Sequence, residues 1–178
     1  TKGLNRIENA ARFITLNKTC YNGLYRVNKK GLFNVPIGRY KNPLICDPVN
    51  LRKMSIVLRQ SGSYLEAIDY KKILVEKADK DDFVYLDPPF HPISKTANFT
   101  SYTNNGFTFE DQKELATIFK ELTLRGCKLL LSNSNTEEIR RLYSDFSHLT
   151  ELALVNRAIN AVGSKRVGHV ELLIRNYT

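Results

Sequence analysis

The chain reads FVYLDPPF over residues 83–90, and this stretch predicts a short buried strand with a sharp end. The apolar run from Phe83 to Leu86 suits one interior strand. Two prolines follow Asp87, and proline has no N–H to donate to a sheet, so strand pairing must stop there. The Asp87 carboxylate is therefore expected at the carboxyl end of a strand, where α/β proteins bind ligands.

Helices and strands alternate after this segment. Thr108 precedes Glu110 and Asp111 as a helix N-cap would, and Gly126 is typical of a helix end. The expected elements are a polar loop at 91–106, a helix from 108 to 126, a strand at 128–132, a helix from Thr136 through Phe146, and strands at 148–155 and 169–175. Strands separated by helices imply a largely parallel sheet, whereas the last two strands, with no helix between them, can pair antiparallel.

The first third of the chain has a different character. Apolar residues at helical spacing predict a helix over 4–16, and similar patterns predict helices at 48–60 and 64–77. Residues 19–43 are rich in Asn, Gly, Lys, Arg and Tyr. The run Asn28-Lys29-Lys30-Gly31 favours a hairpin turn, because Asn and Gly accept positive φ. We interpret this stretch as an exposed hairpin or lobe that is both basic and aromatic.

The positive charge of the chain lies in that first third. The net charge is +9; residues 1–60 contain 12 basic and 2 acidic side chains, whereas residues 61–178 contain 15 basic and 16 acidic ones. Such an excess indicates a polyanion partner, because basic side chains that neutralise phosphates release condensed counterions. The alternative is a solvated basic face without a partner.

Several classes of protein are disfavoured by composition. No apolar run approaches the roughly 20 residues of a membrane span, and neither a membrane span nor a signal peptide is expected. The three cysteines include no C-x-x-C pair, and the three histidines show no spacing typical of metal ligands, so neither a disulfide framework nor a metal site is expected. These features predict a cytoplasmic protein with reduced, buried cysteines.

The tetrapeptide Asp87-Pro88-Pro89-Phe90 is the sharpest chemical signal. A rigid carboxylate beside a free backbone carbonyl can accept both hydrogens of an exocyclic amino group, and the aromatic residue can stack on the ring that carries the amine. The alternative is a Pro-Pro strand terminator with Phe90 in the core.

Three parts of the sequence resemble the Dam-type adenine-specific DNA methyltransferases. They are the block NGLYRVNKKGLFNVPIGRYKNP, the strand FVYLDPPF with the loop PISKTANFTSYT, and the C-terminal RAIN…SKR…ELLIRNY. The resemblance implies an α/β fold, as part of a Rossmann-like methyltransferase sheet that depends on S-adenosylmethionine (SAM), with an inserted hairpin and helical DNA-recognition lobe. It implies methyl transfer from SAM, without a metal, to the N6 amino group of a flipped-out adenine in double-stranded DNA, typically in GATC.

The resemblance also implies roles for individual residues. Asp87, Pro88, Pro89 and Phe90 match the catalytic motif, in which Tyr is commoner than Phe at the fourth position. Asp87 is expected near the amino-acid end of SAM, and Ser63 and Tyr64 near its adenine, although Tyr64 also fits a core position. The residues that the resemblance assigns to DNA are Tyr21, Asn22, Arg26, Pro36, Arg39, Tyr40 and Lys41.

Within this DNA-binding set, Arg26 is the candidate for reading a guanine edge, because a guanidinium can donate twice to N7 and O6. Tyr21 and Asn22 suit the space left by a flipped base. Arg39 and Lys41 suit phosphates or flanking bases, or supply nonspecific charge only.

The Gly-rich SAM loop of the family does not occur in the sequence. We therefore expect residues 1–62 to form the recognition lobe and 63–178 the C-terminal part of the catalytic domain. An N-terminal segment of the same enzyme is expected to complete it, either as part of the same polypeptide or as a separate chain. Without that segment the chain is expected to be inactive. Two alternatives stay open: a DNA-binding fragment without activity, and an RNA or protein N-methyltransferase with a D-P-P-F site. A restriction-modification role and a Dam-like marking role are both compatible with the sequence.

Overall fold

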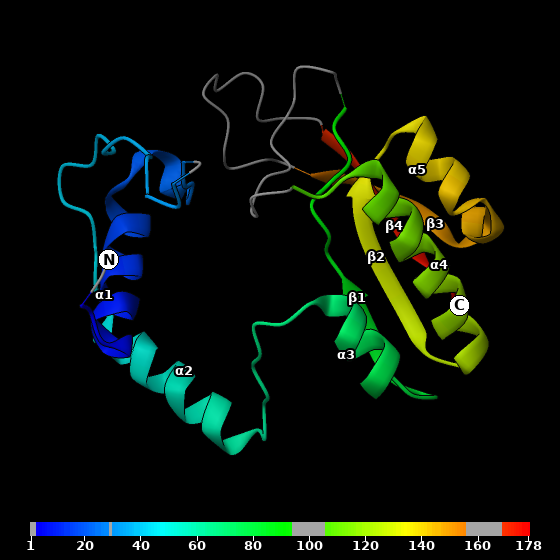
Figure 1. Cartoon of the computed structure of the whole chain (residues 1–178), viewed down its shortest axis with the longest axis horizontal. Helices are drawn as coiled ribbons and strands as arrows, with labels where there is room; N and C mark the ends of the chain where they lie inside the picture. The colour runs from blue at the N-terminus through cyan, green and yellow to red at the C-terminus, as the bar shows by residue number, and fades with distance from the viewer. Residues whose placement is uncertain (1–2, 29, 94–105, 156–168) are drawn as a thin grey trace. The chain divides into compact units, whose positions relative to one another are not determined.

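The computed structural model describes residues 3–28, 30–93, 106–155 and 169–178. The predicted loop at 91–106 and the RAIN…SKR motif therefore lie largely outside the described residues. The chain divides into two compact units, Thr1–Glu66 and Ala67–Thr178 (Figure 1). The expected division at residues 62 and 63 into a recognition lobe and a catalytic part stays a prediction.

In its described residues, the first unit contains two α-helices and a short 3₁₀ turn. Helix α1, Arg6–Thr19, begins with a capping box, in which the Asn5 side chain accepts from the N–H of Glu8 and the Glu8 carboxylate accepts from the N–H of Asn5. The turn η1 spans Tyr21–Gly23. Helix α2, Pro48–Gln60, has the predicted bounds, with Asp47 as its cap and proline at its first position.

The predicted hairpin is present only as two isolated antiparallel bridges, Cys20 to Ile37 and Val27 to Phe33. Its turn is closed by the Asn28 side chain, which accepts from the backbone N–H groups of Lys30 and Leu32, and Gly31 has a φ of +72°. Asn28 and Gly31 thus act as predicted. Regular strands do not form around them, because Gly and Pro interrupt the ladder.

The second unit starts with helix α3, Tyr70–Lys77, which is shorter than the predicted helix at 64–77. The prediction was wrong at its start, because the Asp69 side chain accepts from the N–H of Lys71 and caps the helix there. Strand β1, Phe83–Leu86, follows and has the predicted bounds.

The following elements run from Phe109 to the end of the sheet. Helix α4, Phe109–Arg125, is capped by Thr108 and ends at Gly126, as predicted. The others are strand β2, Lys128–Ser134, helix α5, Glu137–Leu142, the 3₁₀ helix η2, Ser144–Leu149, strand β3, Thr150–Val155, and strand β4, His169–Arg175. The predicted helix through Phe146 therefore ends early, and β3 begins two residues later than expected.

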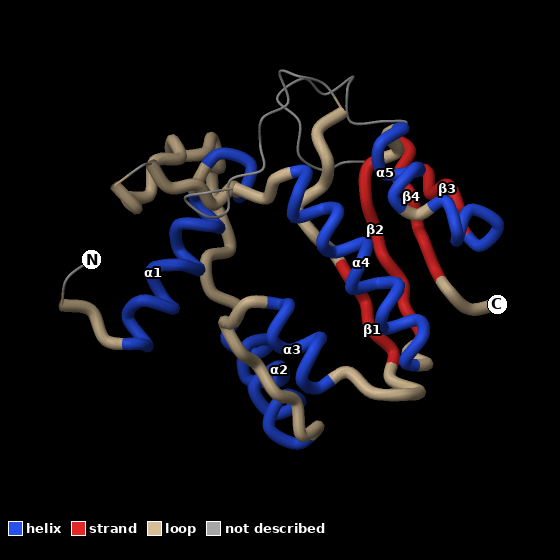
Figure 2. Tube along the Cα trace, turned by 45° about the vertical axis from the view of Figure 1, so that its right-hand side comes forward, coloured by secondary structure: helices blue, strands red, loops and turns tan. Residues whose placement is uncertain are grey.

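Among the described residues, four strands form one mixed sheet in the order β1-β2-β4-β3 (Figure 2). β1 pairs parallel to β2, with Leu86 opposite Leu131, whereas β4 is antiparallel to both β2 and β3. The predicted α/β class is confirmed, and so is the antiparallel pairing of the last two strands, β3 and β4. The described sheet is less parallel than expected, because β4 is antiparallel to β2 as well. β1, β2 and β3 do run in one direction; β4 lies between β2 and β3, so only one ladder of the described sheet is parallel.

The core lies between one face of this sheet and the helices. Leu129 and Leu131 of β2 pack with Leu172 and Ile174 of β4 against α4, and side chains of α3 and α5 join the same cluster. Phe83 and Tyr85 of β1 point to the opposite face and are 59% and 53% exposed. Cys20 and Cys127 are buried as expected, but Cys46 is exposed.

Candidate functional site

The loop Asp87–Phe90 lies at the carboxyl end of β1, beside the carboxyl end of β2. The two strands are parallel and Leu86 pairs with Leu131, so Asp87 comes next to Ser132. The Ser132 hydroxyl donates to Asp87 Oδ1 at 2.8 Å. Ser132 has only one hydroxyl hydrogen, so the Tyr85 hydroxyl, 3.0 Å away, donates to Ser132 Oγ. The pair of hydroxyls orients one oxygen of an otherwise exposed carboxylate.

The two proline carbonyls differ in their surroundings. Gln112 Nε2 of α4 donates to the Pro89 carbonyl at 2.9 Å. Within the described part of the chain, the Pro88 carbonyl accepts no hydrogen bond. The second Asp87 oxygen and the Pro88 carbonyl are therefore the acceptors that this loop leaves for a ligand.

The far end of the loop is held by β2. Asn133 Oδ1 accepts from the His91 N–H at 3.0 Å, and the His91 ring lies 3.2 Å from the Thr136 hydroxyl. Phe90, between Pro89 and His91, is partly buried. Asn133 and Gln112 are 0% and 1% exposed, which is unusual for two polar side chains.

A cavity of about 500 Å³ opens beside this loop, within the second unit. Its walls combine aromatic and aliphatic side chains with carboxylates and one lysine. The residues that line it are Ile68, Asp69, Tyr70, Lys71, Tyr85, Leu86, Asp87, Pro88, Pro89, Gly106, Phe107, Asp111 and Leu115. Such a site can hold a flat ring against its apolar walls and hydroxyl or ammonium groups against its carboxylates.

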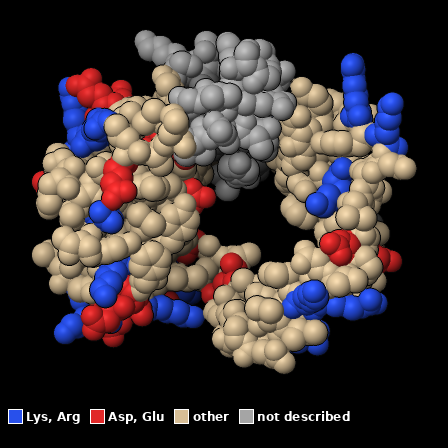
Figure 3. Space-filling view, turned by 180° about the vertical axis from the view of Figure 1, so that it is seen from behind, with Lys and Arg blue, Asp and Glu red and all other residues tan. Residues whose placement is uncertain are grey.

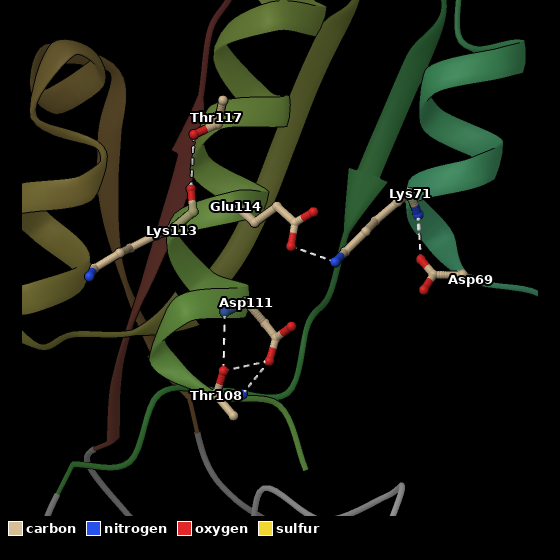
Figure 4. A network of polar contacts seen from close by, with 7 residues as sticks. All are labelled: Asp69, Lys71, Thr108, Asp111, Lys113, Glu114 and Thr117. Atoms are coloured by element: carbon tan, nitrogen blue, oxygen red, sulfur yellow. Dashed lines mark hydrogen bonds and ion pairs between the residues drawn. The ribbon is translucent and has the colours of Figure 1, made fainter. Parts of the chain in front are cut away.

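One ion pair between α3 and α4 and the capping box of α4 fix two of these wall residues (Figure 4). Lys71 forms an ion pair with Glu114, and this hydrogen bond raises the pKa of Lys71. Asp111 accepts from the hydroxyl and the N–H of Thr108, and these bonds lower the pKa of Asp111. Burial raises the pKa of Tyr70 to about 12. At neutral pH the cavity therefore presents the Asp111 carboxylate beside an uncharged Tyr70.

Sequence reasoning missed part of this site. In the sequence Asp69 suggests only a solvated helix end, and Tyr70 and Phe107 belong to no motif. The sequence feature that could have located Tyr70 is the helix cap at Asp69, which places Tyr70 at the first position of α3. Ser63 and Tyr64, assigned to SAM from the resemblance, belong to the first unit, and that assignment stays a prediction.

The residues assigned to DNA lie in the first unit. Tyr21, Arg26, Pro36, Arg39, Tyr40 and Lys41 are exposed, and Asn22 is partly buried. Arg26 Nε donates to Asn34 Oδ1 at 2.9 Å, and Arg26 Nη2 donates to the Asn34 carbonyl at 3.1 Å. Lys and Arg side chains stand out from the surface in Figure 3. The two bonds to Asn34 hold the Arg26 guanidinium along one edge, and its other edge faces no partner among the described residues.

Two absences hold for the described residues. No three His, Cys, Asp or Glu side chains gather there as a metal site would require. In the same part of the chain, no helix combines the length and the apolar character needed to cross a bilayer.

Comparison with known proteins supplies an independent result. The sequence pattern of the family described as "D12 class N6 adenine-specific DNA methyltransferase" matches residues 1–156. The chain is 48% identical over 175 residues to the type II methyltransferase M.MjaIII of Methanocaldococcus jannaschii, covering 97% of this chain and 59% of that protein.

Two further relatives agree with this match. The type II methyltransferase M1.LlaDCHI of Lactococcus lactis subsp. cremoris is 41% identical over 175 residues, covering 98% of this chain and 60% of that protein. The DNA adenine methylase of Escherichia coli K12 is 37% identical over 172 residues, covering 97% and 60%. The chain therefore spans about 60% of the length of these relatives.

Proposed function

Because the chain belongs to the D12 class N6 adenine-specific DNA methyltransferase family, we propose that its protein methylates the N6 amino group of adenine in double-stranded DNA, within GATC. The family implies SAM as the methyl donor. The observation that carries the proposal is the pair of acceptors at the end of β1: one oxygen of Asp87 and the Pro88 carbonyl, beside the cavity.

This pair suits an amino group that has two hydrogens. When both N–H groups point at Asp87 and Pro88, the nitrogen lone pair is directed away from the loop, toward the methyl donor. Asp87 Oδ2 also stabilises the positive charge that develops on N6 during transfer, and it is the nearest acceptor for the proton that N6 then loses. Ser132 keeps Oδ1 occupied, so that Oδ2 is the oxygen presented to the base.

The residues of the cavity fit SAM. Tyr70, Phe107 and Ile68 offer apolar walls for its adenine ring, and Asp69, Asp111 and Asp87 offer acceptors for hydroxyl and ammonium groups. The volume of about 500 Å³ lies in the ordinary range for such ligands. Bound there, SAM supplies an electrophilic methyl carbon on a sulfonium that leaves as a neutral thioether.

The first unit is the proposed DNA-recognition lobe. Its basic side chains favour a polyanion. Arg26 reads a guanine edge, Tyr21 and Asn22 occupy the space left by the flipped adenine, and Arg39 and Lys41 contact phosphates. Pro36 and Tyr40 complete the DNA-facing set, and Phe90 stacks on the extruded base in the second unit.

A further segment of the same enzyme completes the catalytic unit in this proposal. Among the described residues, β1 has a strand neighbour on one side only, and Phe83 and Tyr85 leave its outer face exposed. Such an edge and face call for a covering element. The relatives are also longer than this chain. An N-terminal segment that pairs with β1 supplies the remaining wall of the SAM site.

Methyl transfer from labelled SAM to a GATC duplex tests the proposal, with the protein expressed from its full reading frame. Asp87→Asn is expected to slow transfer by a factor on the order of a hundred or more, because it removes the charge opposite the developing cation. Asp145→Asn is the matched control, since Asp145 forms a surface ion pair with Lys120, away from the loop.

The substrate panel separates the alternatives. A duplex that carries 2-aminopurine at the target position has no amino group at position 6 and is expected to accept no methyl group. Transfer to RNA or protein but not to DNA would replace this proposal by the N-methyltransferase alternative. If the protein expressed from its full reading frame binds the duplex tightly but transfers no methyl group, the alternative of a DNA-binding protein without activity would replace this proposal.

A further inference from the structure

A directional chain of two side-chain amides connects the backbone on either side of Phe90. The His91 N–H donates to Asn133 Oδ1 at 3.0 Å, Asn133 Nδ2 donates to Gln112 Oε1 at 3.0 Å, and Gln112 Nε2 donates to the Pro89 carbonyl at 2.9 Å. This path of hydrogen bonds therefore starts at the backbone N–H of the residue after Phe90 and ends at the carbonyl of the residue before it.

Both amides are buried at an energetic cost that packing alone does not require. Gln112 is 1% exposed on α4 and Asn133 is 0% exposed on β2, beside a core cluster made mainly of leucine and isoleucine. Burying a polar group is unfavourable unless its hydrogen bonds are made. Asn133 makes three, because its Oδ1 also accepts from the N–H of Ser134 at 2.8 Å.

At positions 112 and 133, only a side chain that both donates and accepts can keep this path of hydrogen bonds intact. An ionised aspartate or glutamate would offer acceptors only, and serine is too short to join β2 to α4. The fixed polarity suits the loop, because Pro89 has a carbonyl to offer but no N–H, and His91 supplies the N–H. The two prolines and the two amides thus restrict the same short stretch of backbone.

We infer that Gln112 and Asn133 are positioning residues for methyl transfer, which hold the peptide units on both sides of Phe90 so that its ring meets the extruded adenine in one orientation. This inference rests on the proposed function. The hydrogen bond from Gln112 to the Pro89 carbonyl fixes the peptide unit that precedes Phe90. Loss of the amide chain should therefore impair transfer itself more than the binding of DNA or SAM.

The first test compares Gln112→Met, which keeps the shape but not the hydrogen bonds, with Ile118→Val, which perturbs the core on the same helix without touching the loop. Under single-turnover conditions, Gln112→Met is expected to lose about tenfold to a hundredfold in rate, with KM for DNA and SAM changed by less than about twofold. Ile118→Val is expected to lose stability but to keep the wild-type rate. Equal rates for the two variants would overturn the inference.

A double-mutant cycle with Phe90→Leu distinguishes positioning from general damage. If Gln112 acts through Phe90, adding Gln112→Met to Phe90→Leu should lower the rate by less than about twofold. If Gln112→Met lowers the rate as much in the Phe90→Leu variant as in the wild-type protein, the inference is contradicted.

Gln112→Glu gives a readout that a purely structural role would not move. Burial raises the pKa of the new carboxyl group. When protonated, this group can donate to the Pro89 carbonyl and accept from Asn133, so its rate relative to wild type should recover as the pH falls from about 9 to about 6. A ratio that does not change with pH would argue against the amide chain.

Hydrogen exchange at the His91 amide, which donates to Asn133, tests the same path of hydrogen bonds without any need for activity. The His91 amide should exchange about tenfold faster in Gln112→Met than in wild type, and less than about threefold faster in Ile118→Val. If no variant transfers methyl groups but His91 responds in this way, the proposed function fails while the positioning of the loop stands. An unchanged His91 amide overturns the inference whatever the activity.

Discussion

Ser132 donates its hydroxyl hydrogen to Asp87 at 2.8 Å, across the only parallel ladder in the described sheet. The contact joins the end of one strand to the interior of its neighbour. It depends on register, because a shift of one residue would turn the Ser132 side chain to the other face. Ser132 itself accepts from Tyr85, so two hydroxyls in series orient the carboxylate.

Ser132→Ala should lower kcat for methyl transfer by about tenfold, with little change in KM for DNA, since one hydrogen bond to a charged group is lost and the carboxylate becomes free to rotate. Steady-state kinetics on a GATC duplex measure the effect. Ser134→Ala, two residues further along the same strand, serves as the control. If the two variants behave alike, the hydroxyl of Ser132 does not orient Asp87 for catalysis.

Local signals explain why parts of this site were predictable. The strand β1 stops at Leu86 because prolines follow, and α4 begins and ends at a capping box and a glycine, all of which are signals carried by neighbouring residues. The partners of the loop are not. The loop Asp87–His91 is contacted by Ser132, Asn133 and Gln112, which strand pairing and helix packing bring close to it. No neighbouring residue in the sequence predicts those contacts.

The topology of the sheet shows the same limit. The alternation of helices and strands predicts the direction of β1, β2 and β3, but the position of β4 between β2 and β3 follows from the pairing of residues far apart in sequence. The cap at Asp69 also outweighs the apolar spacing that favoured a helix from residue 64.

Asn34→Ala should reduce discrimination between GATC and sites in which the guanine is replaced, by about tenfold. Asn34 holds Arg26 along its Nε edge, which leaves Nη1 and the outer hydrogen of Nη2 for the base. Competition binding at fixed salt measures the ratio. Lys30→Ala should instead weaken binding to all duplexes alike and lower the salt slope by about one. Unchanged discrimination in Asn34→Ala would mean that its contact with Arg26 does not set specificity.

Gly38→Ala should weaken DNA binding by disturbing the basic lobe. A Cβ at this position would lie 2.3 Å from Tyr40 Cε2 and 2.9 Å from the Cys20 carbonyl oxygen. The Tyr40 ring can rotate away, but the Cys20 backbone cannot move without breaking its bridge to Ile37. We expect a loss of about tenfold in duplex affinity and a destabilisation of about 1–3 kcal/mol. Gly31→Ala has free space around its Cβ, and its cost comes from the positive φ alone; equal affinity losses would contradict the steric argument.

Thr108→Val should destabilise the protein in a pH-dependent way. Removing this N-cap costs about 1 kcal/mol at neutral pH. Thr108 also lowers the pKa of Asp111 below its ordinary value of 3.8, so the Asp111 contribution is present above that pH and is lost as the pH falls below it. Urea unfolding should therefore show a difference between wild type and variant that shrinks toward acid pH. A constant difference across that range would show that Asp111 is not coupled to Thr108.

Tyr143→Phe should raise the free energy of unfolding by about 1 kcal/mol. The Tyr143 side chain is 1% exposed, and its hydroxyl has no hydrogen-bond partner among the described residues. Its ring packs edge-on against Phe119, with 5.3 Å between centroids, and phenylalanine keeps that contact. Burial raises the pKa of Tyr143 above the ordinary value of 10.0, so the unfolded chain loses this proton more readily than the folded protein. Below that pH the group causes no change of stability with pH, and above it the wild-type protein loses stability as the pH rises.

Urea unfolding at neutral and at alkaline pH measures both effects of Tyr143→Phe, which should also flatten the alkaline loss of stability. Tyr85→Phe is the opposite case, because the Tyr85 hydroxyl is paired with Ser132. Its removal should lower stability by about 1 kcal/mol. The two hydroxyl deletions are thus expected to differ in sign, since one removes an unmade hydrogen bond and the other a made one. A destabilised Tyr143→Phe would reveal a partner, such as a buried water, for that hydroxyl.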